Sequence, residues 1–205
     1  DGWLMLPYPL EYGAGYELIE VESPHGYFLD GKSVYFDVDG SEAIVTVVKK
    51  NTPQKGRIIV HKTGEVLSHI EQNGDVYQPV YTVQGLPGAV YDVIASKNIV
   101  TGDGTVRAQK GDVVDTITTS KTGTGSSDLL YLGQYEIVER IVPENMTLNP
   151  NPKKVVLSYA GQTIDVTEAS TEVYNERQRV AVSLTKYMEQ DEQFHIGMNE
   201  EILSV

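Results

Sequence analysis

Lysine, glutamate and asparagine recur in strand-like segments of this chain, and these three residue types together can form an isopeptide bond. Lys62 alternates with Ile58 and Val60, so its amine shares a strand face with two aliphatic side chains. Glu139 shares a face with Ile137 in the same way. Burial among apolar side chains favours a neutral lysine amine, which is a nucleophile, and a protonated carboxyl, which can polarise an amide and carry protons. An asparagine side chain then supplies an acyl carbon, with ammonia as the leaving group.

Each of these residues has a counterpart elsewhere in the sequence. Residues 16–20 (YELIE) match residues 135–139 (YEIVE) with an offset of 119 positions. An asparagine followed eleven residues later by a lysine also occurs twice, with an offset of 124. A repeat of about 120 residues, with loops of unequal length, explains both offsets. The paired residues are Glu20 and Glu139, Asn51 and Asn175, and Lys62 and Lys186.

The same residues also fit roles without covalent chemistry. Lys62 and Glu139 could form a buried ion pair, or one of them could extend its charge to the rim of the core. Asn175 could simply cap a turn. The recurrence of all three residue types favours a shared chemical role.

The elements that must position these side chains are predicted to be strands. Runs rich in Val, Ile, Thr and Tyr are separated by Gly, Asn and Asp turns, and no long amphipathic helix competes with them. This pattern predicts an all-β antiparallel sandwich or barrel. The clearest runs are residues 33–38, 43–48, 90–95, 113–119 and 155–159.

The repeat predicts how the chain divides into modules. Residues 1–55 are interpreted as the C-terminal part of one module, 56–179 as a complete module, and 180–205 as the opening strand region of a third. In the last of these, Val180, Val182 and Leu184 alternate with Lys186. The junctions at 51–56 and 175–179 are too short for flexible linkers, so neighbouring modules are expected to be coaxial and stiff.

Composition excludes several classes of function. The 205 residues carry a net charge of −13, which disfavours nucleic acid and anionic membranes as partners. The absence of cysteine excludes disulfides, thiolate-bound metals and thiol nucleophiles. No run reaches the roughly 20 apolar residues of a membrane-spanning helix, and no leader precedes Asp1, so membrane insertion and targeting signals are not expected within this stretch.

Cofactor and metal sites are not predicted either. Asp37 and Asp39 resemble a fragment of a calcium loop, but the glutamate that completes such a site is missing and a hairpin turn explains them. The glycine-rich residues 123–127 lack a phosphate-binding signature and are expected to form a flexible connection. Any cross-linking would therefore proceed without a cofactor.

Several motifs, in order, resemble one family. Residues 15–20 (GYELIE) and 24–27 (PHGY) look like the E-box of the B-type domains of Gram-positive collagen adhesins, also called SpaA-type pilin domains. Residues 86–91 (LPGAVY) are similar to the strand motif that follows the reactive lysine, and Asn51 and Asn175 stand at the position of the last-strand asparagine. One departure is residues 143–146 (PENM), which lack the Gly-Tyr pair after Glu139.

The resemblance implies tandem β-sandwich modules with a prealbumin-like (transthyretin-like, inverse immunoglobulin) fold. It further implies an autocatalytic bond from Lys62 to Asn175, with Glu139 as the catalytic acid. Glu20 and Asn51 would be the corresponding residues of the first module. The protein would then be a structural stalk or pilin-like repeat, secreted to the surface or wall of a Gram-positive bacterium, rather than an enzyme with turnover.

Two alternatives and one assembly hypothesis accompany this interpretation. The modules could be an adhesive tip that binds a host matrix protein or glycan, or an accessory module of a glycosidase. Partners are otherwise expected to be neighbouring modules of the same protein. Because residues 180–190 have the pattern of an opening strand, they could complete the first module of another molecule in a head-to-tail exchange, with a bond from Lys186 to Asn51.

Overall fold

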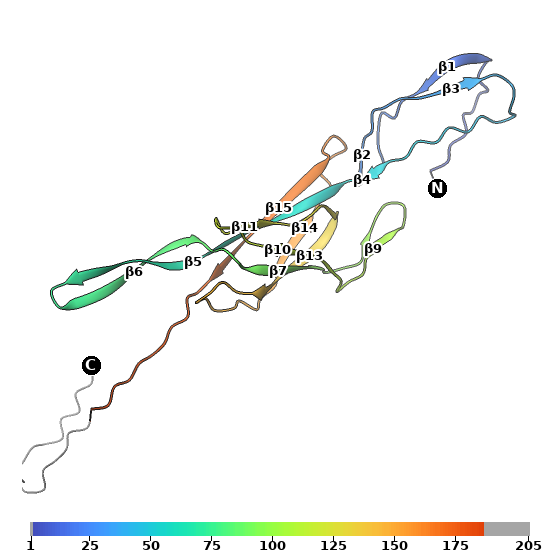
Figure 1. Cartoon of the computed structure of the whole chain (residues 1–205). Coiled ribbons are helices and arrows are strands. Elements are labelled where there is room, and N and C mark those ends of the chain that lie inside the picture. The colour runs from blue at the N-terminus through green and yellow to red at the C-terminus, as the bar shows by residue number, and fades with distance from the viewer. Residues whose placement is uncertain (1, 187–205) are drawn as a thin grey trace, which may run out of the picture.

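The computed structural model describes residues 2–186, which form strands and loops without a helix (Figure 1). None of these residues therefore forms a helix long and apolar enough to cross a membrane. The strands are β1 (Gly13–Leu18), β2 (Tyr27–Phe28), β3 (Val34–Val38), β4 (Thr52–Pro53), β5 (Lys55–Asn73), β6 (Val76–Gly85), β7 (Val90–Ala95), β8 (Ile99–Val100), β9 (Val106–Ala108), β10 (Val113–Thr118), β11 (Thr124–Ser126), β12 (Leu130–Tyr131), β13 (Gly133–Ile141), β14 (Lys153–Leu157) and β15 (Val166–Asn175).

The central part of the chain is a two-sheet sandwich. One sheet has the order β10-β7-β13-β14, and in the other β5 pairs with β6, β11, β12 and β15. Alternate residues of both sheets point into one core, which includes Ile58, Val60, Tyr91, Val93 and Ile137. Buried and less buried residues alternate along the whole of β7, as expected for a strand with one face on the core. The prediction of an all-β sandwich is confirmed.

The first and last strands of this sandwich lie side by side and run parallel. β15 pairs with β5 from Val166 beside Lys55 to Asn175 beside Gly64. The other ladders within the two sheets are antiparallel. The parallel pair brings Lys62 next to Val173, two residues before the candidate asparagine.

The N-terminal part repeats one hairpin of the central sandwich. β1 pairs with β3 so that Tyr16 lies opposite Phe36, and β13 pairs with β14 so that Tyr135 lies opposite Val155. Both partners are 119 positions apart in the sequence, so the two hairpins share the same register.

The strand predicted over residues 43–48 does not form. Its counterpart in the central sandwich is β15, which is held by its parallel ladder to β5. No strand of the described chain lies beside residues 43–48 in that way, so their backbone groups have no ladder to join.

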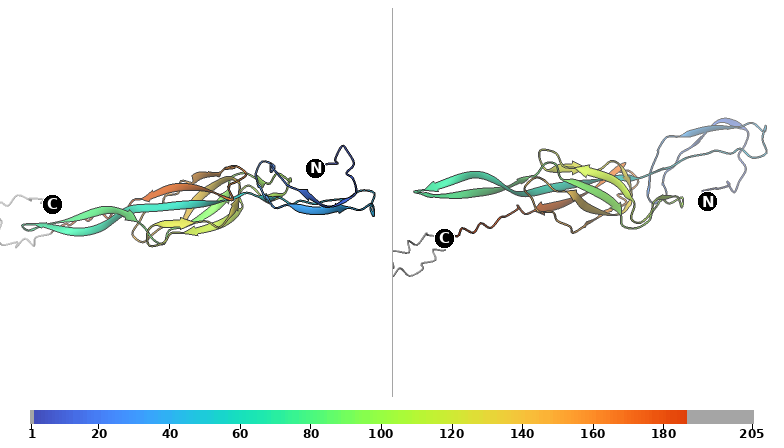
Figure 2. Two further views of the ribbon diagram at one scale, coloured as in Figure 1. Left: turned by 90° about the horizontal axis from the view of Figure 1, so that it is seen from above. Right: turned by 60° about the horizontal axis from the view of Figure 1, so that its bottom comes forward.

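A network of hydrogen bonds joins the N-terminal part to the central sandwich. The Gln54 side chain is buried. Its amide nitrogen donates hydrogen bonds to the backbone carbonyls of Gly161 and Ile164, and its amide oxygen accepts one from the backbone N–H of Ala160. The Tyr27 hydroxyl accepts from the backbone N–H of Asp103 at 2.9 Å. The junction therefore has its own polar contacts, and the two parts lie end to end in both views of Figure 2.

Two segments extend from the opposite end of the sandwich. The hairpin of β5 and β6 projects beyond the core, and its outer half is exposed (Figure 1). Residues 180–186, predicted to be a strand, have no secondary structure and are exposed. The rest of the predicted opening region, residues 187–205, lies outside the described residues.

Residues 123–127 do not form the flexible connection that was expected. They include β11, which pairs with β5 through Gly125 opposite Val60. Gly123 has a φ of +78°, and a Cβ there would lie 2.3 Å from the carbonyl oxygen of Lys62. Glycine is therefore required for close backbone packing beside the candidate lysine, rather than for flexibility.

Candidate cross-linking site

The structure brings Lys62, Glu139 and Asn175 together in the core. Lys62 comes from β5, Asn175 from the end of the adjacent β15, and Glu139 from β13 in the facing sheet. All three are buried, with Lys62 completely inaccessible and Asn175 1% exposed. The strand phases read from the sequence therefore place these side chains correctly in the interior.

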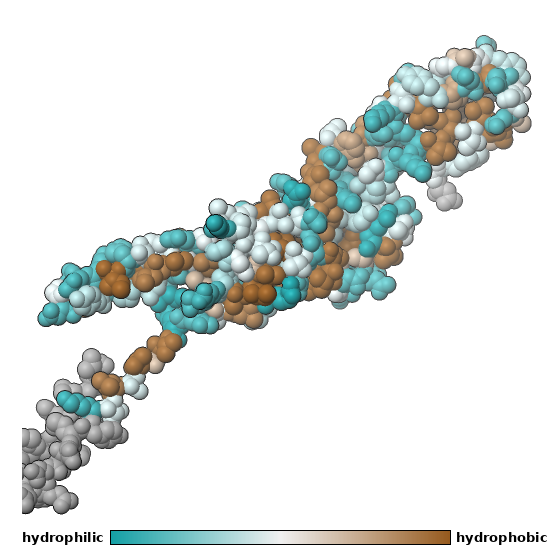
Figure 3. Space-filling view, viewed as in Figure 1, coloured by the Kyte–Doolittle hydropathy of each residue, from teal (hydrophilic) through white to brown (hydrophobic). Residues whose placement is uncertain are grey.

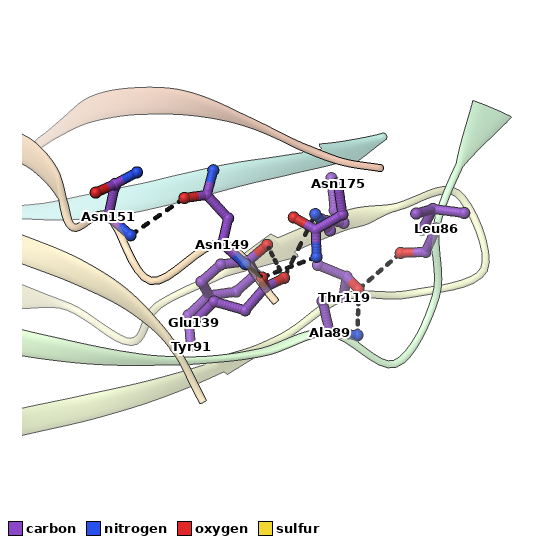
Figure 4. Close-up of polar contacts among 9 residues, drawn as sticks. Leu86, Ala89, Tyr91, Thr119, Glu139, Asn149, Asn151 and Asn175 are labelled. Atoms are coloured by element: carbon purple, nitrogen blue, oxygen red, sulfur yellow. Dashed lines mark hydrogen bonds and ion pairs between the residues drawn. The ribbon is translucent and has the colours of Figure 1, made fainter. Parts of the chain in front are cut away.

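The Glu139 carboxylate is the centre of the cluster (Figure 4). Its Oε1 atom lies 3.4 Å from Lys62 Nζ and accepts a hydrogen bond of 3.1 Å from the Tyr91 hydroxyl. Its Oε2 atom accepts a bond of 2.8 Å from Asn175 Nδ2 and one of 3.2 Å from the backbone N–H of Asn149. One carboxyl group thus contacts the candidate nucleophile through one oxygen and the candidate leaving group through the other.

Two reactive atoms of the cluster lack hydrogen-bond partners among the described residues. Lys62 Nζ and Asn175 Oδ1 are both buried without one. A buried amine is costly in its charged form, and an unpaired amide carbonyl also costs free energy. Burial accordingly lowers the pKa of Lys62, although the nearby Glu139 carboxylate opposes this shift.

Tyr91 is a site residue whose role the sequence did not reveal. Its side chain is buried, and desolvation, followed by the neighbouring Glu139 charge, raises the pKa of the Tyr91 hydroxyl. The hydroxyl therefore stays protonated and remains a donor to Glu139. The β7 alternation that buries Tyr91 was visible in the sequence, but its contact with Glu139 depends on the pairing of β7 with β13.

The departure from the E-box after Glu139 leaves the local geometry unchanged. Asn145 has a φ of +63°, and its counterpart Gly26 has a φ of +89°, so both occupy the left-handed region. Met146 is buried like its counterpart Tyr27, and each donates its backbone N–H to the carbonyl of the proline three residues before it. Asparagine tolerates this conformation better than most residues, which explains how the turn persists without glycine.

The first set of predicted residues is also partly assembled. Asn51 Nδ2 donates a hydrogen bond of 2.6 Å to Glu20 Oε1, as Asn175 does to Glu139. Glu20 Oε2 is buried without a hydrogen-bond partner in residues 2–186. Lys186 is exposed and is not brought to either glutamate within this chain.

The candidate calcium fragment lies at the end of β3 and in the bend that follows it, and the predicted hairpin does not form there because β3 pairs with β1 and not with the next strand. Asp39 Oδ1 accepts bonds from the backbone N–H and the hydroxyl of Ser41, and Asp37 Oδ1 accepts from the backbone N–H of Gly15. No cluster of three potential metal ligands occurs among residues 2–186.

Comparison with known proteins agrees with this architecture. Residues 80–172 match the family model of the SpaA prealbumin-like fold domain. No curated protein matches the chain. The chain is similar to the solved structure of the Bacillus anthracis TIE protein, with 20% identity and a TM-score of 0.50 over 82% of this chain and 26% of that one. It is also similar to GBS52, the minor pilin of Streptococcus agalactiae, with 14% identity and a TM-score of 0.40 over 65% of this chain and 49% of that one.

These findings define the class of the central sandwich as a prealbumin-like β-sandwich. The match of residues 80–172 to the SpaA prealbumin-like family model confirms the fold and the family resemblance read from the sequence. It spans about a quarter of the length of the TIE protein and about half of that of GBS52.

A protein without the cross-link should become more stable as the pH rises. In an Asn175→Ala variant the Lys62 amine is retained, and its pKa in the folded state is below its ordinary value of 10.5. Between the folded-state pKa and 10.5, the unfolded chain binds this proton more tightly than the folded chain does. The free energy of unfolding therefore rises with pH over this range, and the gain is lost as the pH falls through the folded-state pKa.

Urea denaturation between about pH 7 and 10 measures this effect. The matched control is Lys62→Met in the same Asn175→Ala background, which removes the titrating amine and should remove its share of the slope. Parallel pH profiles for the two variants would contradict the lowered pKa.

Proposed function

We propose that this chain is part of a structural stalk or pilin-like repeat of an adhesin on the surface of a Gram-positive bacterium, stabilised by an autocatalytic isopeptide bond from Lys62 to Asn175. The observation that carries this proposal is the shared contact of Lys62 and Asn175 with the Glu139 carboxyl inside an apolar core. The match to the SpaA-type family model supports the surface role.

The contacts support a specific proton path. Lys62 gives a proton to Glu139 Oε1, and its neutral amine attacks Cγ of Asn175. The new C–N bond forms, the bond from Cγ to Nδ2 breaks, and Glu139 delivers a proton to the departing nitrogen, which already contacts Oε2. The attacking nitrogen then gives up a second proton, which the same carboxyl passes to the ammonia. The leaving group departs as ammonium, and Glu139 is again a carboxylate.

Formation of the bond also relieves an electrostatic cost. Before reaction the core holds a lysine amine whose charged form is poorly solvated. Afterwards a neutral secondary amide occupies that position, and the buried amine no longer titrates. The folded core therefore favours the product, and no cofactor is required by this sequence of steps.

The position of the bond suits a stalk under tension. β5 opens the central sandwich and β15 closes it, so a Lys62–Asn175 bond would carry force directly between the strands at which the chain enters and leaves. The roughly 110 residues between them would bear no load.

Pulling single molecules from both ends tests this function. In the wild type the central sandwich should not extend, whereas Glu139→Gln should release roughly 350 to 400 Å of chain when it unfolds, since an extended residue spans at most about 3.6 Å. Asn149→Ala is the matched control, because the contact of residue 149 with Glu139 uses the backbone N–H. An equal extension in wild type and Glu139→Gln would contradict the proposal that the bond carries the force.

An adhesive role remains the second candidate because the projecting hairpin exposes apolar side chains. Ile70, Val76 and Tyr77 are each more than half exposed on β5 and β6. Saturable binding to immobilised matrix protein or glycan that is lost on substitution of these three residues would favour a tip over a stalk.

A further inference from the structure

Gly64 follows Lys62 on the core-facing side of β5 and is the last buried residue of that strand. In the parallel ladder with β15 it lies directly beside Asn175, whereas Lys62 lies beside Val173. The two cross-linking residues are therefore offset along the ladder by about 6.6 Å, the rise of two strand residues. The long lysine side chain has to span this offset, so the position of Asn175 beside Gly64 decides how closely the amine approaches Cγ.

The space beside Gly64 has no room for a side chain. A Cβ there would lie 2.8 Å from the backbone oxygen of Asn175, 2.6 Å from Cδ1 of Leu86 and 3.4 Å from Sδ of Met146. Leu86 and Met146 are themselves buried. The Leu86 side chain can rotate away, but the Asn175 oxygen belongs to the backbone of β15. An added methyl group would therefore push the end of β15 away from β5.

Other reasons for a glycine do not apply at this position. The φ of Gly64 lies outside the left-handed region, so other residues can adopt its backbone conformation. The ladder of β5 with β6 continues through Gly64 opposite Gln84, and its irregularity lies farther out, between Leu67 and His69. Glycine is therefore not required there to turn β5 into the projecting hairpin, the slender extension at the left of Figure 3. The close approach of β15 explains the residue.

The backbone of Lys62 is held from the side opposite β15. Its N–H donates a hydrogen bond of 2.7 Å to the carbonyl of Gly123, and its carbonyl accepts one of 3.0 Å from the N–H of Leu86. These bonds lie where the neighbour of β5 changes from β11 to β6. Because Lys62 is fixed in this way, a shift of Asn175 would separate the amine from Cγ and would not move both together.

We propose that Gly64 is a positioning residue for the isopeptide reaction, and that the absence of a side chain there sets the approach of Asn175 Cγ to the Lys62 amine. This inference rests on the cross-linking chemistry proposed above. A misplacement of about 1 Å can slow a reaction between oriented groups by about 100-fold. Gly64→Ala requires a displacement of several tenths of an ångström. It should therefore slow the loss of ammonia by roughly 10- to 100-fold.

Gly56 provides a matched control on the same strand. It is buried and pairs with Thr167 at the far end of the ladder from Asn175. A Cβ at Gly56 would lie 2.6 Å from Thr167 Cγ2 and 3.0 Å from the Thr167 backbone oxygen, and its φ is also outside the left-handed region. Gly56→Ala therefore crowds the same two strands away from the reacting groups. A general loss of stability should appear in both variants, and slow chemistry in Gly64→Ala alone.

The experiment follows the loss of ammonia by intact mass at timed intervals during cell-free synthesis of the whole chain, with each sample stopped in denaturant. Gly64→Ala should lose ammonia roughly 10- to 100-fold more slowly than the wild type, and Gly56→Ala at a rate close to that of the wild type. Urea denaturation measures the stability of each glycine variant in the Asn175→Ala background, where the bond cannot form. Both substitutions should lower the urea midpoint there, because both overpack the core.

A double variant covers the case in which Gly64→Ala does not fold. Leu86→Ala removes the side chain nearest to the added methyl group, so Gly64→Ala combined with Leu86→Ala isolates the contact with the Asn175 oxygen. The double variant should lose ammonia more slowly than Leu86→Ala alone. Reaction of Gly64→Ala at the wild-type rate, or reaction of Gly56→Ala as slow as that of Gly64→Ala, would overturn the proposal while the cross-link stands. If the wild type itself keeps its ammonia, the proposed function fails and this inference fails with it.

Discussion

The intact chain should weigh one ammonia less than its sequence requires, and a proteolytic digest should contain a peptide that joins Lys62 to Asn175. The reaction needs only Lys62, Asn175 and the Glu139 carboxyl that both of them contact, so it should run to completion when the central sandwich folds. Intact-mass measurement under denaturing conditions detects the loss directly, because no non-covalent contact survives there.

Variants separate the roles of the three residues. Lys62→Met and Asn175→Ala remove a bonding partner and should restore the full sequence mass. Glu139→Gln keeps the shape of the side chain but removes its ability to carry protons, so its mass should be full or approach the cross-linked value only slowly. Asn149→Ala is the control and should lose ammonia as the wild type does, because only its backbone contacts Glu139.

An unmodified mass in the wild-type protein would contradict the cross-link. Lys62 and Glu139 would then be a buried ion pair, the non-covalent role that the sequence also allowed. Loss of ammonia without a Lys62–Asn175 peptide would show that another asparagine or glutamine reacts.

Sequence alternation predicted that Lys62 and Glu139 are buried because the relevant strands have one face on the core. Lys62 and Glu139 each repeat at even spacing with apolar residues, and the period of two fixes which face a side chain occupies. The repeat then identified Asn175, whose own alternation is weaker. Local pattern and long-range repetition pointed to the same three residues, and the structure brings them together.

The contacts that depend on strand order could not be predicted in this way. Tyr91 reaches Glu139 because β7 neighbours β13, and the backbone N–H of Asn149 reaches it from a loop. A single sequence indicates which face of a strand a side chain occupies more directly than it indicates which strands lie next to each other, because strand order is set by the global topology. Close backbone approach is equally hidden, which is why Gly123 was interpreted as part of a flexible connection rather than as a packing requirement beside Lys62.

The strand predicted over residues 43–48, which does not form, shows a further limit of prediction from sequence. Its composition has strong β-propensity, but a strand exists only with a hydrogen-bonding partner. In the central sandwich the same pattern is ordered by β5. The β-propensity of residues 43–48 therefore indicated that they could form a strand, but no neighbouring strand in the described chain pairs with them.

Removal of the cross-link should lower the melting temperature of the central sandwich by on the order of 10 to 20 °C. The bond would close a loop of about 110 residues, and the loop entropy of an equivalent disulfide gives roughly 4 to 5 kcal/mol of stabilisation by restraint of the unfolded chain. Such a value is comparable with the net stability of many small domains. Scanning calorimetry of wild type and Asn175→Ala measures the difference, and limited proteolysis should find the central sandwich resistant in the first and cleaved in the second.

The matched comparison must separate lost entropy from lost contacts. Asn175→Ala also removes the Asn175 side chain from the core and leaves the Lys62 amine buried and able to titrate, so its lower melting temperature would combine lost contacts with lost restraint. Glu139→Gln retains a side chain of the same size at the centre of the cluster, so unreacted and slowly reacted fractions of that one variant differ only by the bond itself. The reacted fraction should melt at the higher temperature. Equal melting temperatures of the two fractions would show that the bond does not stabilise the central sandwich by restraining its unfolded chain.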